Sequence, residues 1–370
     1  MILLRRELHQ RPEPAGHEER TAAAVASRLT AAGIPVTTGV GGHGVVAVVE
    51  GGTPGPTIAY RADMDAMLTA AGPAHLCGHD VHTAIGVGIA QTLARTPFAG
   101  RAMVLFQPAE ETLEGARAML ASGVFASGVP DEVYALHCGP YPVGTFGVMP
   151  GVGQPGQDTG HVEGGDAALV AAIEGLSTVR RPTNDAEFQR LFADLHTPDG
   201  PLRRFVFAES WIEPGSAAAR FAVRAWPDDR YPELRTELHR LAGDRRIVFD
   251  GDPFPAMVCS AELSTLAAAH LLTVPGVSSI ATMHAAFPFN GEDFGLFLAH
   301  APGAMFFLGV GPAGVPHAPT FTVDERAIPL GVRAMTSLLL DRLAALARRQ
   351  DGATRPSPSE SSTGRRGPAT

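Results

Sequence analysis

Lysine is absent from this 370-residue sequence, so all 29 basic residues are arginine. The absence excludes chemistry that needs a lysine amine: Schiff bases with pyridoxal phosphate, P-loop and kinase phosphate binding, and Ser-x-x-Lys hydrolysis. Acidic residues outnumber basic ones by 38 to 29, which gives a formal net charge of -9. Because this balance repels polyanions, we expect neither a nucleic acid nor an anionic membrane as a partner.

Cysteine is also scarce, with Cys77, Cys138 and Cys259 as the only three. A small and odd number of cysteines does not form a disulfide framework, which favours a reducing compartment. No apolar run approaches the ~20 residues that cross a bilayer. Arg5 and Arg6 follow a short apolar run, which is the reverse of the order in a secretory signal. We therefore expect a cytoplasmic protein.

Strand-like and helix-like segments alternate along the chain, which is typical of an α/β fold. The glycine-rich stretch 151–165 is interpreted as a linker. A strand at Ala168–Ile173, a helix at Asp185–Leu195 and the elements after them predict a smaller β-α-β-β-α-β unit. A long helix is expected at Ile328–Arg349. The predicted divisions are a large α/β domain from 1–160 and 253–350, an inserted α+β domain at 161–252 and a disordered tail at 351–370.

The densest polar cluster holds His75, Cys77, His79, Asp80 and His82. One glycine separates Cys77 from His79, and this spacing can place a thiolate and an imidazole on one metal ion. A lone cysteine or histidine is more often a core or surface residue than a ligand. The density of the cluster favours a metal site, but its spacing alone leaves the two interpretations level.

A pair of glutamates, Glu110 and Glu111, follows the strand expected at 102–107. Open α/β sheets gather their sites at the C-terminal ends of strands, where one carboxylate can bind a metal while the other moves protons. The alternative is a helix N-terminus, where the helix dipole favours glutamate. His137 and His317 come at the end of a strand and in a loop after a strand, and each is a weak signal alone.

Taken in order, these motifs resemble the amidohydrolase branch of the aminoacylase and carboxypeptidase family of metal-dependent exopeptidases, which includes N-acyl-amino-acid and auxin-conjugate amidohydrolases. The resemblance covers about residues 4–348. It implies a zinc-peptidase-like catalytic domain with a smaller α+β lid, one or two divalent ions such as zinc, manganese or nickel, a small-molecule amide as substrate, and a homodimer through the lid. The motifs that carry it are Arg5–His9 with Arg11–Glu13, Arg61–Ala66, Cys77–Ala84, Phe106–Glu111, Leu136-His137, Gly291–Phe294 and Pro316-His317.

The resemblance also implies roles for single residues. Glu110 is implied to be the general base that takes a proton from water and returns it to the leaving amine. Asp63 and Asp80 are implied to orient the metal ligands. His75 and His82 are interpreted as structural residues. Two others are interpreted as helix-start residues near the cleft: Glu292 and Asp293. The implied metal ligands are Cys77, His79, Glu111, His137 and His317.

The lid departs from the family pattern where relatives carry a histidine in a Gly-Gly-His context. Ser177 stands at the matching place. Because serine is short and neutral, Ser177 can replace that donor to the substrate only if the lid closes further. Otherwise we expect a cation such as Arg180, Arg181 or Arg220 to take the role, with solvated surface charge as the alternative for each arginine. The predicted function is hydrolysis of an N-acyl or peptide-like amide of a specialised kind. The alternatives are a dipeptidase or carboxypeptidase of the same family, or a metal-binding pseudoenzyme.

Overall fold

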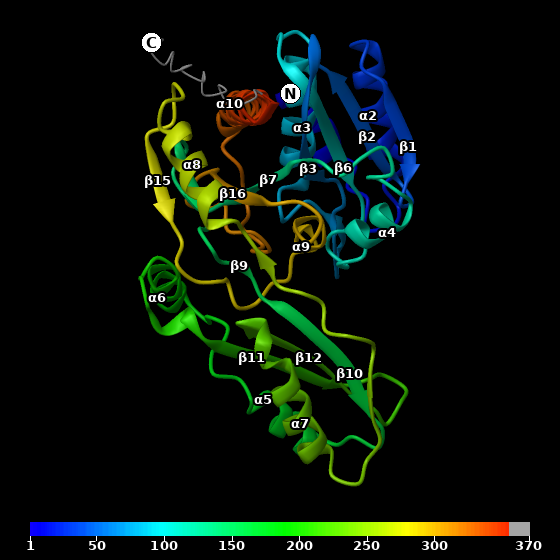
Figure 1. Ribbon diagram of the computed structural model, residues 1–370. Coiled ribbons are helices and arrows are strands. Elements are labelled where there is room, and N and C mark those ends of the chain that lie inside the picture. The colour runs from blue at the N-terminus through cyan, green and yellow to red at the C-terminus, as the bar shows by residue number, and fades with distance from the viewer. Residues whose placement is uncertain (355–370) are drawn as a thin grey trace, which may run out of the picture.

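A mixed eight-stranded sheet is the centre of the larger of two units in the computed structural model, which describes residues 1–354 (Figure 1). Its order is β1-β2-β6-β3-β7-β16-β8-β15, so a strand from the C-terminal part of the chain lies between two strands that precede the smaller unit. These strands are β1 (Val36–Val40), β2 (Gly44–Glu50), β3 (Thr53–Asp63), β6 (Ala99–Gln107), β7 (Glu132–Gly139), β8 (Thr145–Val148), β15 (Ser279–Thr282) and β16 (Gly303–Gly309).

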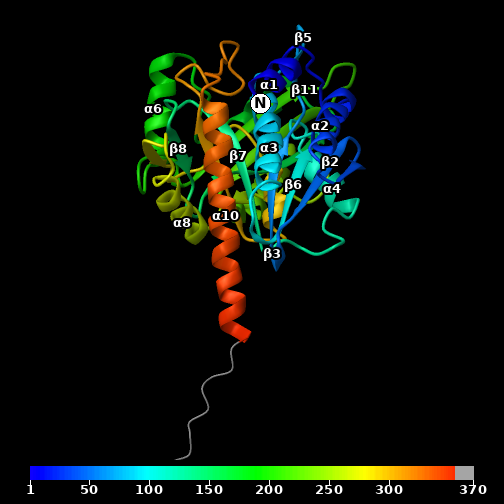
Figure 2. The same cartoon turned by 90° about the horizontal axis from the view of Figure 1, so that it is seen from above.

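Helices cover this sheet, and α3 and α10 pack together across one face of it (Figure 2). Almost every residue of α3 is buried, including the polar His79, Asp80 and His82 of its first turn, because the helix lies between α10 and the sheet. The helices of the larger unit are α1 (Ile2–His9), α2 (Glu19–Ala31), α3 (His79–Leu93), α4 (Gly115–Ala121), α8 (Ala261–Leu271), α9 (Phe294–Leu298) and α10 (Ala327–Thr354). A short hairpin, β4 (Met67–Thr69) with β5 (Gly72–Ala74), precedes α3.

The C-terminal helix agrees with its prediction and continues through Thr354. The remainder of the predicted tail, 355–370, lies outside the described residues. Within residues 1–354, none of the helices combines the length and the apolar composition that a membrane crossing needs.

The smaller unit, called the lid below, is an antiparallel four-stranded sheet of order β11-β12-β10-β13 (Figure 1). Two of its helices, α5 and α7, pack against each other and against this sheet. The short strands β9 (Gly153–Gln154) and β14 (Met257–Val258) pair where the two units join. The lid elements are β10 (Gly156–Val162), α5 (Ala167–Glu174), α6 (Asp185–Leu195), β11 (Phe205–Ile212), β12 (Ala219–Trp226), α7 (Tyr231–Ala242) and β13 (Ile247–Phe249).

Two predictions for the start of the lid are wrong. The expected linker at 151–165 contains β9 and β10, so the lid sheet begins at Gly156, before the predicted boundary at 161. The strand was not predicted because glycine gives no strand signal in the sequence. At Gly160 a Cβ would lie 2.3 Å from the carbonyl oxygen of Val248, so the close strand pairing leaves no room for a side chain.

The second error concerns the expected strand at Ala168–Ile173, which is part of helix α5. A short apolar run does not by itself distinguish a helix from a strand. Asp166 decides the outcome, because its side chain accepts the N–H of Leu169 (2.8 Å) and caps the helix. Leu169 and Ile173, one turn apart, are then both buried against the lid sheet.

Candidate metal centre and active site

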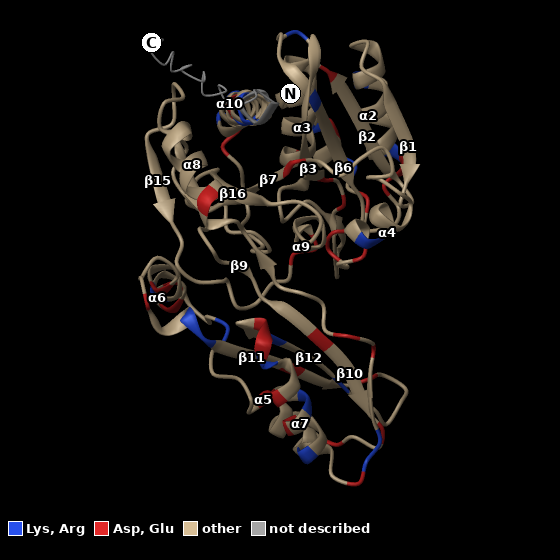
Figure 3. Ribbon diagram, viewed as in Figure 1, with Lys and Arg blue, Asp and Glu red and all other residues tan. Residues whose placement is uncertain are grey.

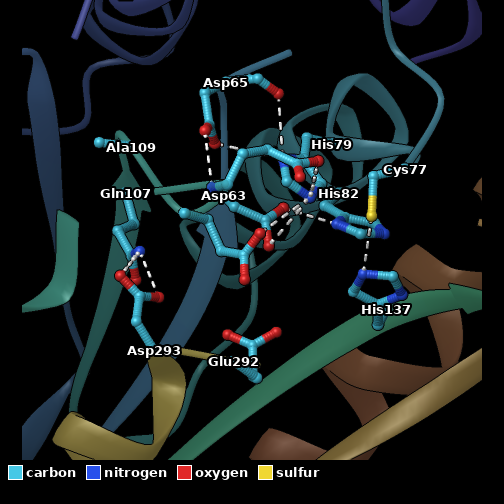
Figure 4. Close-up of polar contacts among 12 residues, drawn as sticks. Asp63, Asp65, Cys77, His79, His82, Gln107, Ala109, His137, Glu292 and Asp293 are labelled. Atoms are coloured by element: carbon cyan, nitrogen blue, oxygen red, sulfur yellow. Dashed lines mark hydrogen bonds and ion pairs between the residues drawn. The ribbon is translucent and has the colours of Figure 1, made fainter. Parts of the chain in front are cut away.

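Four segments that are distant in the sequence bring the five predicted metal ligands together. Figure 4 shows three of them: Cys77, His79 and His137. Cys77 and His79 lie at the start of α3, Glu111 follows β6, His137 is in β7 and His317 is in the loop after β16. The Sγ of Cys77 lies 3.3 Å from Nε2 of His137 and 3.2 Å from Nε2 of His317. The carboxylate of Glu111 lies 3.9 Å from Nε2 of His79 and 3.7 Å from Nε2 of His317.

The backbone at this site adopts conformations that need tight local packing. Gly78, between the first two donors, has φ +92°, and a Cβ there would lie 2.7 Å from the Sγ of Cys138. Ala109 (φ 52°), which precedes the predicted base, and His317 (φ 66°) are left-handed although neither is glycine. Such residues cost of order 1–3 kcal/mol each, and this strain is found where a site requires an exact side-chain direction.

Hydrogen bonds to the backbone set the direction of two imidazoles. Nδ1 of His79 donates to the carbonyl of Asp65 (2.9 Å), and Nδ1 of His137 donates to the carbonyl of Cys138 (2.8 Å). Because a carbonyl only accepts, the neutral form of each ring carries its proton on Nδ1 and presents a lone pair at Nε2. Nε2 of His79 therefore faces the two glutamates, and Nε2 of His137 faces the Cys77 thiol, so both are potential metal ligands.

Unpartnered polar atoms indicate that the donor set is built for a cation. Nε2 of His79 and Oε1 of Glu111 are buried and have no hydrogen-bond partner among the described residues. A buried polar atom without a partner costs free energy, and a bound divalent ion would remove that cost. Thiolate, imidazole and carboxylate donors suit a borderline ion such as zinc. Cys77 belongs to two donor groups, one with His79 and His137 and one with Glu111 and His317.

The electrostatics of the cluster also favour a positive ion. Burial lowers the pKa of His79, but the carboxylate of Asp63 and the Cys77 thiolate more than offset this, so the pKa is raised well above its usual value. Burial raises the pKa of Glu111 to about 7. Burial and the charge of His79 lower the pKa of His317 to about 4, which keeps this imidazole in the neutral form that metal binding requires.

Glu110, the predicted base, lies beside the donors without being part of the Cys77 groups. Its Oε2 is 3.7 Å from Nε2 of His79, and its side chain is almost fully buried. Burial, followed by the negative charge of Glu292, raises the pKa of Glu110 well above its usual value. A carboxyl group with a raised pKa holds a proton more readily than an exposed glutamate does, which suits a residue that returns a proton to a leaving group.

A buried arginine organises the carboxylates behind the donors. Arg61 is 1% exposed and contacts Asp63, Glu292 (3.0 Å) and Asp293 (2.9 Å), while its Nε donates to Gln107 (2.9 Å). Burial lowers the pKa of Arg61, but these carboxylates raise it further than burial lowers it. Glu292 and Asp293 do precede α9, as predicted. Their carboxylates also hold Arg61 in place, which their position in the sequence did not indicate.

The two aspartates that were expected to orient ligands have different surroundings. Asp63 accepts a hydrogen bond from Nδ1 of His82 (2.6 Å) and lies 3.8 Å from His79. Asp80 instead pairs with Arg5 (2.8 Å) and His9 (2.8 Å) of α1. It therefore holds the N-terminal helix against α3. Asp65, which was not predicted, also touches a predicted ligand, because it contacts Nδ1 of His79 through its carbonyl and its carboxylate. Its place in the Arg61–Ala66 motif was the available signal.

A cavity of about 380 Å³ lies between the larger unit and the lid, and the metal donors form part of its wall. Of the four residues expected to meet substrate, Arg181 lines this cavity and the other three do not. Ser177 bonds both backbone groups of Ala208 inside the lid, and Arg220 pairs with Asp250 (2.9 Å). Arg180 is exposed to solvent.

The family model described as peptidase family M20/M25/M40 matches residues 59–341 of this chain. The chain belongs to this family. It is 30% identical over 361 residues to N-acetyldiaminopimelate deacetylase of Exiguobacterium sibiricum, and the match covers 90% of this chain and 97% of the relative. It is also 30% identical over 385 residues to thermostable carboxypeptidase 2 of Saccharolobus solfataricus, with 92% and 94% covered.

Among solved structures, the chain is similar to the Bacillus subtilis YXEP protein, described as a dinuclear metal-binding peptidase from the M20 family. The TM-score is 0.70 at 25% identity, and the match covers 93% of this chain and 97% of that chain. These matches confirm the resemblance drawn from the motifs, the two-part α/β architecture and the hydrolase class.

A second arginine of this M20 chain lines the cavity and was not predicted from the sequence. Arg224 on β12 contacts Glu209 (3.3 Å), which also binds Arg181 (3.0 Å). Arg181 further stacks over the rings of Phe207 (5.0 Å) and Phe289 (5.3 Å). Two cations share one carboxylate, so the wall keeps an excess positive charge. Figure 3 shows basic segments at the end of the lid sheet beside α6.

Proposed function

We propose that this M20 protein is a metal-dependent amidohydrolase that cleaves an N-acyl amino acid or a similar amide with a free carboxylate. One observation carries the proposal: the buried Glu110 lies beside a cluster of five metal donors, in a cavity whose lid wall holds Arg181. The chain thus offers a proton carrier, a metal site and a cation within one small volume.

Cys77, His79, Glu111, His137 and His317 would hold the metal, and a bound divalent ion supplies a Lewis acid that activates water and polarises a carbonyl. Glu110 would take a proton from the attacking water and return it to the leaving amine, and its raised pKa suits the return step. We propose zinc, manganese or nickel as the ion.

Arg181 and Arg224 would bind the substrate carboxylate. Glu209 neutralises only one of the two charges, so the pair retains attraction for an anion. Arginine is suited to this task because its guanidinium stays charged and its planar donors match a carboxylate. Arg181 also takes the place that we expected for a cation in a lid without the family histidine, whereas Ser177, Arg180 and Arg220 do not line the cavity.

A carboxypeptidase or dipeptidase is the second candidate, because one relative of similar identity is named as a carboxypeptidase. A pseudoenzyme that only binds metal is the third candidate.

We further propose a cytoplasmic homodimer. Strand β11 is at the edge of the lid sheet, where Trp211 and Ile212 are 44% and 42% exposed, and a second lid could pair there.

The test is turnover of matched N-acyl amino acids and dipeptides by full-length protein reconstituted with zinc, manganese or nickel. We expect hydrolysis of N-acyl amino acids, with faster turnover than for dipeptides that have the same C-terminal residue. Faster dipeptide cleavage would favour the peptidase. No hydrolysis of either series by protein with a full metal complement would favour the pseudoenzyme.

A further inference from the structure

A carboxylate from the N-terminal part of the chain reaches the loop that carries Glu110. Glu18 lies at the start of α2 and is fully buried, and its Oε1 accepts the N–H of Ala109 (2.9 Å), 91 residues further along the chain. The same oxygen accepts the N–H of Gly16 (2.9 Å). Because Ala109 directly precedes Glu110, this contact joins the start of α2 to the backbone of the proposed base.

The carboxylate of Glu18 is not used to cap its own helix. A polar side chain at a helix start ordinarily accepts an N–H of the first turn, but Glu18 makes no such bond within the described part of the chain. Glu13 does so instead, since its carboxylate accepts the N–H groups of Arg20 (3.2 Å) and Thr21 (2.8 Å). Helix α2 is therefore capped without Glu18, whose carboxylate is directed to Ala109.

The burial of Glu18 is costly, which argues against an incidental contact. Its Oε2 is buried and has no hydrogen-bond partner among residues 1–354, and burial raises the pKa of this carboxyl group. A buried polar atom without a partner lowers the free energy of unfolding, so a carboxylate at this place calls for an explanation. The contact that only this side chain supplies is the hydrogen bond to the loop of Glu110.

The loop itself needs to be held from outside. Ala109 is left-handed (φ 52°), and a non-glycine residue keeps such a conformation only when its surroundings impose it. Glu18 binds the N–H of Ala109, and Oδ2 of Asp65 accepts the N–H of Glu111 (2.9 Å). Both carboxylates are buried, so water competes weakly for these hydrogen bonds. Glu110 thus projects from a backbone that two carboxylates fix, one on each side of it.

The segment that carries Glu18 is anchored to the larger unit. The carbonyl of Glu13 accepts the N–H of Ala66 (2.8 Å), and Pro14 forms a parallel bridge with Ala66. Ala66 follows Asp65 directly, so the same segment lies against both loops that flank the proposed base. Glu18 therefore presents its carboxylate from a fixed position.

Building on the proposed function, we propose that Glu18 is a positioning residue whose hydrogen bond to Ala109 holds the left-handed turn that directs Glu110 at the donor cluster. Glu18 is not among the described residues that line the cavity, so it acts only through the direction of the Glu110 side chain. Misplacement of a reacting group by about 1 Å can cost roughly 100-fold in rate. Loss of this hydrogen bond should therefore lower kcat, while KM and metal content stay nearly unchanged.

The experiment compares Glu18→Ala and Glu18→Gln with the unaltered protein, all full-length and metal-loaded, on the N-acyl amino acid that the unaltered protein hydrolyses fastest. Glu18→Ala should lower kcat by about 10- to 100-fold and leave KM within about threefold. Glu18→Gln keeps an oxygen that accepts the N–H of Ala109 but lacks the charge, so kcat should recover to within about fivefold of the unaltered value. Rates are measured well below each melting temperature and are expressed per bound metal.

Glu13→Ala is the matched control. Glu13 is a buried carboxylate of the same segment, and its side-chain hydrogen bonds within residues 1–354 all go to Arg20 and Thr21 of α2. Its loss should lower the thermal midpoint at least as much as Glu18→Ala does, because a helix cap is removed, and should leave kcat within about twofold. Unchanged kcat in Glu18→Ala, or equal losses of kcat in the two alanine variants, would overturn the inference.

Amide hydrogen exchange gives a readout that does not depend on turnover. The N–H of Ala109 should exchange about 10-fold faster or more in Glu18→Ala than in Glu13→Ala, while the segment with Cys77 and His79 keeps its protection. Unchanged exchange at Ala109 would overturn the inference. Absence of hydrolysis by the unaltered, metal-loaded protein would instead refute the proposed function, and exchange alone would then decide whether Glu18 holds this loop.

Discussion

The metal-donor end of the large sheet and the cavity face of the lid are built on different principles. Near the donors the charged side chains are buried, and Arg61 alone contacts three carboxylates and Gln107. On the lid the ion pairs are partly exposed, as in Arg181 with Glu209, where the side chains are 51% and 38% exposed. The first region fixes a reaction geometry, whereas the second can change its substrate at little cost in stability.

Energetics explain why this division is useful. Removal of one partner of a buried ion pair leaves the other charge uncompensated in a low-dielectric interior. Substitutions near the donors should therefore strongly lower the free energy of unfolding. An exposed pair contributes about 0–1 kcal/mol, so lid residues can be exchanged.

Removal of metal should have the largest effect. Exhaustive chelation should abolish activity and lower the thermal midpoint, because the buried lone pairs of His79 and Glu111 lose their partner. Activity should return with zinc, manganese or nickel. The measurement combines elemental analysis, calorimetric melting and turnover. Full activity in protein with no divalent ion would contradict the assignment of the donor cluster.

Arg61→Met should destabilise the protein by about 3–5 kcal/mol, because it strands the buried carboxylates of Asp63, Glu292 and Asp293. The matched lid change, Arg220→Met, removes a partly exposed pair with Asp250 and should cost about 1 kcal/mol or less. Urea unfolding of both variants measures the contrast. Similar losses would show that the two regions do not differ as described.

Glu110→Gln should lower kcat by roughly 100-fold or more and leave the metal content unchanged, because the amide cannot accept the proton. Glu111→Gln should instead weaken metal binding, since its carboxylate belongs to the donor groups. Measurement of kcat and of metal affinity for both variants distinguishes the base from the metal ligand. Full turnover by Glu110→Gln would refute its role as the base.

Within the lid, Arg181→Ala should lower kcat/KM by roughly 10-fold or more, as expected for loss of a charge-assisted hydrogen bond to substrate. Arg180→Ala and Arg220→Ala should stay within about twofold, because neither residue lines the cavity. Unchanged metal content is the control for all three. Equal losses of kcat/KM in Arg181→Ala and Arg220→Ala would contradict the proposal that Arg181 binds substrate because it lines the cavity.

Asn184→Ala should have the smallest effect. The Asn184 side chain caps α6 by accepting the N–H of Glu187 (3.0 Å), and loss of such a cap costs about 1 kcal/mol. Denaturant unfolding should show this loss, and Asn184→Asp should restore most of it. A loss of several kcal/mol would show that α6 depends on more than its cap.

The larger unit was largely predictable because its strands are strongly apolar and its motifs lie at strand ends. The start of the lid was not, because β10 is rich in glycine and polar residues and α5 is a short apolar run. Helix α6 was predicted at its observed bounds, Asp185–Leu195, since it begins with a capping asparagine and has an amphipathic pattern. Asp80 was placed beside the ligands by its motif, yet α1 packs over it and supplies its partners.

Composition and motifs alone define the chemical groups available to this protein: no lysine, a Cys-Gly-His pair, paired glutamates and two later histidines. They do not reveal which arginine of β12 lines the cavity, because that depends on the packing of the lid. Arg220 and Arg224 share one face of β12 because side chains repeat every second residue, so alternation does not separate them. The strand register separates the two arginines: Arg224 pairs with Gln157 near the start of β10, and Arg220 pairs with His161 about 13 Å further along the strand. That distance places Arg224 at the cavity and leaves Arg220 beside Asp250.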